Sequence, residues 1–253
     1  MNVIPQPPTL WQESAAEAGS NGTSRRRPTH LDLPSEDAVP TNFSEAPQAA
    51  LLTESLQPVL DTLHPDGQYS IGHDSYIYFR EARPPQAGAK SPDWFYVPGV
   101  PPLLDGGFRR SYVLWQEHVA PRVVVELVSS DGEEERDVTP DTGKFWAFEQ
   151  AIRAEYYAIY DPYRFTLEVF RLVAGRYQSV PADAHGRFPV EPLGVALGLW
   201  QGQYRNMTTR WLRWFNPDGV VMPTPQERAA DAQLRAERLA AKLRELGLDP
   251  DAI

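Results

Sequence analysis

The sequence predicts an α/β (α+β) domain in which helices flank a mixed β-sheet. Three observations support this fold class. An amphipathic helical segment begins at residue 44, strand-like segments follow it, and a second helical segment lies between two of the strands. A helix inserted between strands is typical of a crossover connection, which indicates a mixed sheet.

The first helix is expected over residues 44–63, because five apolar residues recur there at helical spacing: Leu52, Leu56, Val59, Leu60 and Leu63. Strands are expected at residues 73–80, 93–97, 122–129, 155–161 and 165–173. Ala174-Gly175 predicts a hairpin between the last strand and residues 176–180. The second helix follows the third strand, with Thr139 as its N-cap and Pro140 in the first helical position.

Both ends of the chain differ from this central part. Residues 1–42 are rich in Pro, Ser and Thr and lack periodicity, which predicts a flexible N-terminal arm before a domain over residues 43–222. Residues 223–253 predict a C-terminal helix with an apolar face that includes Leu239 and Leu243. Two interpretations of this helix remain open: a solvated helix lying on the domain, or a coiled-coil seam that forms a homodimer.

The composition restricts the classes of function. The chain has 253 residues, of which 42% are hydrophobic, and it lacks cysteine, which excludes disulfides, thiol catalysis and cysteine-bound metals. No apolar run is long enough to cross a membrane and no secretory signal is visible, so we expect a cytoplasmic protein without a membrane partner. The net charge of −10 argues against a protein that coats nucleic acid. It is compatible with a nuclease, whose metal needs carboxylates.

Residues 201–215 interleave arginines with tyrosine and tryptophan. Aromatic side chains of such a segment can stack on bases, and its arginines can contact phosphates. A partly buried segment that closes the domain is the more common explanation of this pattern. The acidic loop at residues 129–136 is interpreted as a solvated turn.

Glu126 lies in the middle of an otherwise apolar strand. Side chains of a strand alternate between its faces, and both faces are apolar here, which predicts a central strand covered on both sides. An ionised carboxylate in that position is penalised unless it is paired, hydrogen-bonded or bound to a metal. Pairing with Arg122 or Arg136, exposure to water at the strand end, and a metal site all remain open.

Two further residues complete a candidate site. Asp93 precedes a strand, where aspartate is also a common turn residue, and two carboxylates on neighbouring strands suit Mg²⁺ or Mn²⁺. Lys144 lies near a helix start, where the helix dipole disfavours a cation. It is either a surface lysine or a residue that orients an attacking water. Asp74, beside His73, is a weaker candidate to line the same cleft.

Four segments in order carry a resemblance to a known family: "PDWFYVP", "VVVELVS", "ERDVTPDTGKFWAFEQAIRAEYYAIYDP" and "FRLVAGRYQSV". Together they resemble the Uma2 (Uma-two) family within the PD-(D/E)XK nuclease superfamily, over residues 44–214. The resemblance implies a restriction-endonuclease-like core, and a C-terminal helix of this composition is common in the family.

The resemblance also implies roles for single residues. Asp93 and Glu126 match the carboxylates that hold Mg²⁺ or Mn²⁺, and Lys144 matches a lysine on the following helix. The lysine of the wider superfamily lies two residues after the strand carboxylate, where this chain has Val128. Asp137 matches an aspartate of the connecting loop, which either supports the fold or contacts the metal ligands from outside. Tyr157 and Asp161 match residues that determine the fold.

The implied function is that of a metal-dependent DNA endonuclease that hydrolyses phosphodiester bonds, with DNA as a transient partner. Its catalytic residues are expected to be Asp93, Glu126 and Lys144. The displaced lysine and the net acidity leave an alternative open. This is a degenerate, non-cleaving scaffold protein that oligomerises through its C-terminal helix.

Overall fold

The computed structural model describes residues 26–34, 43–246 and 249. Its centre is a six-stranded sheet in the order β1-β4-β6-β7-β8-β9. The strands are β1 (Tyr69–Gly72), β4 (Trp94–Pro98), β6 (Val123–Leu127), β7 (Tyr156–Asp161), β8 (Thr166–Val173) and β9 (Arg176–Ser179). β6 and β7 run parallel, whereas the other neighbouring pairs are antiparallel. The predicted mixed sheet is thereby confirmed.

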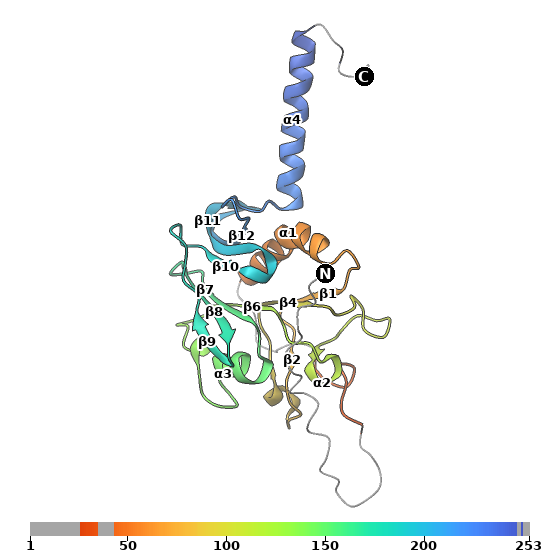
Figure 1. Cartoon of the computed structure of the whole chain (residues 1–253), viewed down its shortest axis with the longest axis vertical. Coiled ribbons are helices and arrows are strands. Elements are labelled where there is room, and N and C mark those ends of the chain that lie inside the picture. The colour runs from red at the N-terminus through yellow and green to blue at the C-terminus, as the bar shows by residue number, and fades with distance from the viewer. Residues whose placement is uncertain (1–25, 35–42, 247–248, 250–253) are drawn as a thin grey trace, which may run out of the picture.

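Helices cover both faces of this sheet (Figure 1). One face packs against α1 (Glu45–Leu63), through side chains such as Val123 and Val125. The other face packs against α3 (Lys144–Trp146) and the π-helical turn η3 (Ala147–Ile152), through side chains such as Val124. Every residue of β6 is buried, which confirms a central strand covered on both sides.

A second sheet, which the sequence does not predict, lies over α1 (Figure 1). It consists of β10 (Phe188–Val190), β11 (Val195–Tyr204) and β12 (Met207–Phe215), with the turn η4 (Glu191–Leu193) between the first two. Gln48 on α1 donates to the Leu212 carbonyl at 2.8 Å and accepts from its N–H at 3.0 Å. The buried Arg213 guanidinium lies 4.8 Å from the Trp200 ring. Residues 201–215 therefore close the domain, as predicted.

A small third sheet contains β3 (Ala89–Lys90), β2 (Ile77–Tyr78) and β5 (Tyr112–Val113), near η1 (Pro85–Gly88) and α2 (Leu114–Glu117). Residues 26–34, expected in a flexible arm, pack against it. The Trp115 indole donates to the Pro28 carbonyl at 2.9 Å, and Leu33 is buried beside Tyr78. The expectation is wrong for these residues. Residues 1–25 and 35–42 lie outside the described residues, so the domain boundary at residue 43 stays a prediction.

The predicted hairpin between β8 and β9 is confirmed. Val173 pairs with Arg176, and the two residues between them have positive φ, 50° at Ala174 and 83° at Gly175. Two such residues form the turn type whose twist matches that of the strands.

The C-terminal helix α4 (Pro225–Glu245) has Thr224 as its N-cap, and Thr224 forms a capping box with Glu227. It buries none of its residues and projects away from the body of the protein (Figure 1). The interpretation of a helix lying on the domain is therefore wrong, and the coiled-coil interpretation stays a prediction. In the described part of the chain, no helix combines the length and the apolar character needed to cross a bilayer.

Candidate metal centre

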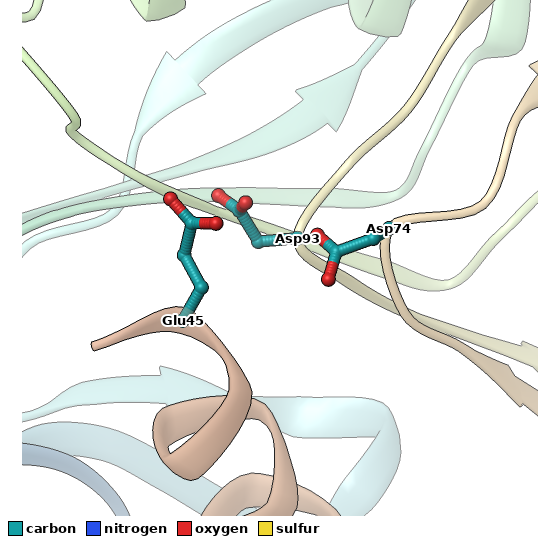
Figure 2. A group of neighbouring side chains, drawn as sticks. All are labelled: Glu45, Asp74 and Asp93. Atoms are coloured by element: carbon teal, nitrogen blue, oxygen red, sulfur yellow. The ribbon is translucent and has the colours of Figure 1, made fainter. Parts of the chain in front are cut away.

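Three carboxylates from separate elements meet at one end of the central sheet (Figure 2). They belong to Glu45, Asp74 and Asp93, and each offers an oxygen that lies within 4.8 Å of those of the other two. Glu45 is the first residue of α1, Asp74 lies in the bend between β1 and β2 with a φ of 45°, and Asp93 directly precedes β4. Such all-oxygen groups suit hard divalent cations.

The sequence pattern indicates Asp93 and, more weakly, Asp74, but it does not indicate Glu45. An acidic residue in the first turn of a helix is ordinary, because it complements the helix dipole. The sequence around Glu45 therefore carries no separate signal of a site.

Thr53 of α1 connects the elements that carry these carboxylates. The Trp94 indole donates to Thr53 Oγ1 at 2.9 Å, and His73 Nε2 lies 3.2 Å from the same atom. Trp94 directly follows Asp93, and His73 directly precedes Asp74. The Thr53 hydroxyl group therefore fixes the chain next to each of these two aspartates close to α1.

Asp93 lies one residue before the stretch of β4 that pairs with β6. Trp94 pairs with Val125, and continuing this register by one residue places Asp93 opposite Glu126 on the same face of the sheet. Asp93 Oδ2 accepts a hydrogen bond from the Leu127 N–H at 2.5 Å. Burial raises the pKa of Asp93 to about 9, and the nearby Glu126 carboxylate adds to this effect.

Glu126 is only 1% exposed. Its Oε2 accepts from Lys144 Nζ at 3.2 Å, whereas its buried Oε1 has no hydrogen-bond partner in the described part of the chain. Burial raises the pKa of Glu126 to about 7, and Lys144 opposes this shift. Arg122 pairs with Glu155 and Arg136 with Glu168, so the interpretation of Glu126 as an arginine partner is wrong.

Lys144 bridges two carboxylates, with Nζ 3.2 Å from Glu126 Oε2 and 3.2 Å from Glu134 Oε1. Burial favours the neutral form of Lys144, but Glu126, Glu134 and Asp93 outweigh it and raise the pKa above its ordinary value. Lys144 is therefore a largely buried ammonium group fixed by two ion pairs, and its interpretation as a surface lysine is wrong.

The helix that carries Lys144 begins later than expected, with Gly143 as its N-cap. The Thr139 carbonyl accepts a hydrogen bond from the Gly143 N–H at 2.8 Å, which forms a turn instead of a helix start. Within this turn Asp141 has a φ of 68°. A left-handed residue cannot continue a helix from Pro140, so the predicted cap is wrong.

The turn before Lys144 is closely packed. A Cβ atom at Gly143 would lie 2.2 Å from the Asp137 carbonyl oxygen, so only glycine fits there. Asp137 Oδ1 accepts from the Thr139 N–H at 2.8 Å, a structural role. Lys90 Nζ donates to the Thr142 carbonyl at 2.5 Å, which ties the turn to β3.

The acidic loop is not a uniform solvated turn, which corrects that interpretation. In η2 (Glu134–Arg136), Glu134 pairs with Lys144 and Glu135 is only 2% exposed. Tyr157 and Asp161 act in the fold. The Tyr157 hydroxyl donates to the Glu135 carbonyl at 2.9 Å, and Asp161 accepts from backbone N–H groups of the following turn.

The raised carboxyl pKa values predict that the metal-free protein loses stability as the pH rises. Both groups have pKa values near 4 when unfolded, against about 9 for Asp93 and about 7 for Glu126 in the fold. The folded state therefore binds more protons throughout this window, and the free energy of unfolding should fall as the pH rises, with about 1.4 kcal/mol per pKa unit of each shift as the upper limit.

Urea unfolding in EDTA across this pH window measures the effect. Asp93→Asn should flatten the profile, because it removes the larger shift. A stability of the wild-type protein that stays constant or rises between pH 5 and pH 9 contradicts the prediction.

A comparison with protein families decides the assignment. The model of the family Uma2, described as "Putative restriction endonuclease", matches residues 35–210. The match covers more than half of the chain. The protein belongs to the Uma2 family. No curated protein matches it.

Membership in the Uma2 family confirms the predicted family and fold class and supports a nuclease activity. The catalytic roles of Asp93, Glu126 and Lys144, the metal and DNA as the substrate stay predictions. In this Uma2 protein the position two residues after Glu126 is the buried Val128, and the lysine at Glu126 comes from the start of α3.

Proposed function

We propose that this Uma2 protein is a metal-dependent DNA endonuclease. Asp93 and Glu126 hold one Mg²⁺ or Mn²⁺ ion, and Lys144 orients the attacking water. The observation that carries the proposal is the Lys144–Glu126 ion pair of 3.2 Å, whose two charges act on Asp93, one of the three converging carboxylates. A cation and an excess of carboxylates at one sheet end are what phosphodiester hydrolysis requires.

The donor set fits a hard cation. The available ligand atoms are carboxylate oxygens, and Glu126 Oε1 is buried without a partner in the described residues. Glu45 and Asp74 lie within reach of the Asp93 side of the site and supply further ligands. When bound, the metal ion polarises the phosphate and makes a water molecule acidic.

Lys144 acts as a cation and not as a base. The surrounding carboxylates raise its pKa above the ordinary value, so it stays protonated at neutral pH. Its ammonium group donates hydrogen bonds to the attacking water and to the charge that develops on the phosphate oxygens. Glu134 holds the same ammonium from the solvent side, which keeps it aimed at the site.

Cleavage of supercoiled plasmid DNA tests the proposal. The wild-type protein should cleave with Mg²⁺ or Mn²⁺ and stop in EDTA, and Asp93→Asn should lower the rate by roughly 100-fold or more, because it removes a metal ligand. Asp66→Asn is a matched control, since Asp66 is an exposed aspartate in a turn. Equal cleavage in EDTA, or full activity of Asp93→Asn, contradicts the proposal.

One observation favours a second candidate, a nuclease-fold scaffold protein that oligomerises through α4. Leu239 and Leu246 are 66% and 70% exposed on a helix that projects from the body. A scaffold protein would show no metal-dependent cleavage, and truncation after Pro223 would lower its mass in solution from that of an oligomer to that of a monomer.

A further inference from the structure

The turn before Lys144 contains a residue in an unfavourable backbone conformation. Asp141 has a φ of 68°, in the left-handed region that residues other than glycine rarely adopt, and its side chain is 61% exposed. Burial of this side chain therefore does not stabilise the conformation. Gly143, two residues further on, is the N-cap of α3, so the conformation of Asp141 determines where that helix starts.

Arg80 binds Asp141 through two groups. Its Nη1 donates to Asp141 Oδ1 at 2.6 Å, and its Nη2 donates to the Asp141 carbonyl at 3.1 Å. A planar guanidinium group that binds the side chain and the main chain of one residue fixes their relative orientation. Arg80 therefore stabilises the left-handed conformation of Asp141 in addition to neutralising its charge.

Arg80 is itself fixed to the third sheet, directly after β2. The N–H groups of Phe79 and Arg80 both donate to the Gly88 carbonyl, at 3.0 and 3.3 Å. Arg80 Nη2 also donates to the Ala87 carbonyl at 3.2 Å, and the guanidinium group lies 5.5 Å from the Phe79 ring. Arg80 thus connects the third sheet to the turn at residues 139–143.

The position of Lys144 depends on this turn. Lys144 Nζ lies 3.2 Å from both Glu126 Oε2 and Glu134 Oε1, and interactions of this length tolerate little further separation. Helix α3 has three residues and a glycine as its N-cap, so the preceding turn places the Lys144 backbone. Misplacement of a group that assists a reaction by about 1 Å can lower the rate roughly 100-fold.

We propose that Arg80 is a positioning residue for Lys144. It holds Asp141, and through it the turn at residues 139–143, so that the Lys144 ammonium group reaches Glu126. Arg80 acts through the backbone and not on the reacting atoms. The proposal rests on the proposed function, in which Lys144 orients the attacking water, and it adds a residue of the third sheet to that arrangement.

Steady-state cleavage of supercoiled plasmid by Arg80→Met tests the proposal. The kcat should fall by roughly 10-fold or more, because Lys144 is displaced, while the KM for plasmid stays at the wild-type value. Arg80 is 38% exposed, so a direct contact with a DNA phosphate is the competing explanation. Loss of such a contact raises KM, weakens the salt dependence of binding and leaves kcat unchanged. That result overturns the proposal.

Arg171 provides a matched control at the opposite end of the central sheet, where β6 and β7 begin. Its side chain is also 38% exposed, it pairs with the exposed Glu191 at 2.5 Å, and its guanidinium group lies 5.5 Å from the Tyr156 ring. Arg171→Met should lower Tm by about as much as Arg80→Met does, but it should retain the wild-type kcat. Equal losses of kcat in the two variants overturn the proposal, because lost stability then explains both.

Two further variants examine the contacts separately. Arg80→Lys keeps the charge but lacks the second donor group, so it should restore only part of kcat. Full restoration overturns the proposal, because charge alone is then sufficient. Asp141→Asn keeps the volume and tolerates the left-handed conformation but weakens the ion pair, so it should lower kcat. If Arg80 instead binds DNA, Asp141→Asn releases it and lowers KM; a lower KM with unchanged kcat overturns the proposal.

This proposal and the proposed function fail separately, because Tm in EDTA reports on positioning without cleavage. Lys144→Met should lower Tm less in the Arg80→Met protein than in the wild-type protein, since Lys144 is already displaced. In the Arg171→Met protein the loss should equal that of the wild type. Equal losses in all three overturn the positioning role and leave the proposed function intact. Unequal losses in a protein that cleaves no plasmid support the positioning role and remove the proposed function.

Discussion

Replacing Glu126 with glutamine is expected to reduce plasmid cleavage by about 1000-fold or more while the protein stays folded. The substitution removes the buried carboxylate that faces Lys144 and, under the proposed function, holds the metal ion. Lys144 keeps its ion pair with the exposed Glu134, so the free energy of unfolding in EDTA should fall by less than the roughly 3–5 kcal/mol expected when a buried charge loses its only partner. Cleavage rates and urea unfolding of the same preparation measure both effects.

Glu149 provides the matched control. It is a buried glutamate on η3, and its carboxylate is bound to the Tyr177 N–H at 2.6 Å and to Arg176 at 3.1 Å. Glu149→Gln should lower stability by about 1–3 kcal/mol, because it weakens these bonds, and it should retain cleavage. If Glu126→Gln keeps wild-type cleavage, Glu126 is not a ligand of an essential metal ion.

Replacing Lys144 with methionine is expected to damage both stability and cleavage. Methionine keeps most of the side-chain volume but leaves the Glu126 carboxylate buried without its cation. Removal of one partner of a buried ion pair costs about 3–5 kcal/mol. The loss should be greatest above pH 7, because the pKa of Glu126 is raised to about 7 and the group is neutral at lower pH. Cleavage should fall by roughly 100-fold or more, since a hydrogen-bond donor to the developing charge is lost.

Urea unfolding as a function of pH, together with the double variant Lys144→Met/Glu126→Gln, separates these effects. The double variant should regain most of the lost stability and none of the cleavage. Lys90→Met is the control, because Lys90 lies close enough to interact with Lys144 but donates to a backbone carbonyl. Equal stability of Lys144→Met and wild-type protein at pH 9 would falsify the assignment of Lys144 as the counter-ion of Glu126.

Local patterns predicted several elements correctly because the physical cause of each lies within a few neighbouring residues. The apolar periodicity of residues 44–63 corresponds to α1, and the apolar run around Glu126 corresponds to the buried strand β6. Ala174-Gly175 forms the predicted hairpin turn. The capping residues and helix formers of residues 224–245 predict α4 without any tertiary contact.

The incorrect predictions involve partners that are distant in sequence. The second sheet was missed because β11 and β12 alternate less regularly than an exposed hairpin, and their buried residues face α1. Thr139 and Pro140 have the residue types of a helix start, but Asp141 takes a left-handed conformation and Gly143 becomes the cap. Glu135 looked solvated because its neighbours in sequence are charged, whereas its neighbours in space are Tyr157 and the core.

The amino-acid sequence alone indicated the family, the mixed α/β fold and the candidate residues Asp93, Glu126 and Lys144, because strand and helix periodicities and an ordered set of motifs are properties of short segments. Only the tertiary structure placed Glu45 and Asp74 beside Asp93 and showed which carboxylates face Lys144. The reason is physical. The charge state and the ligand capacity of a carboxylate depend on burial and on groups within a few ångströms, and those groups come from elements far apart in the chain.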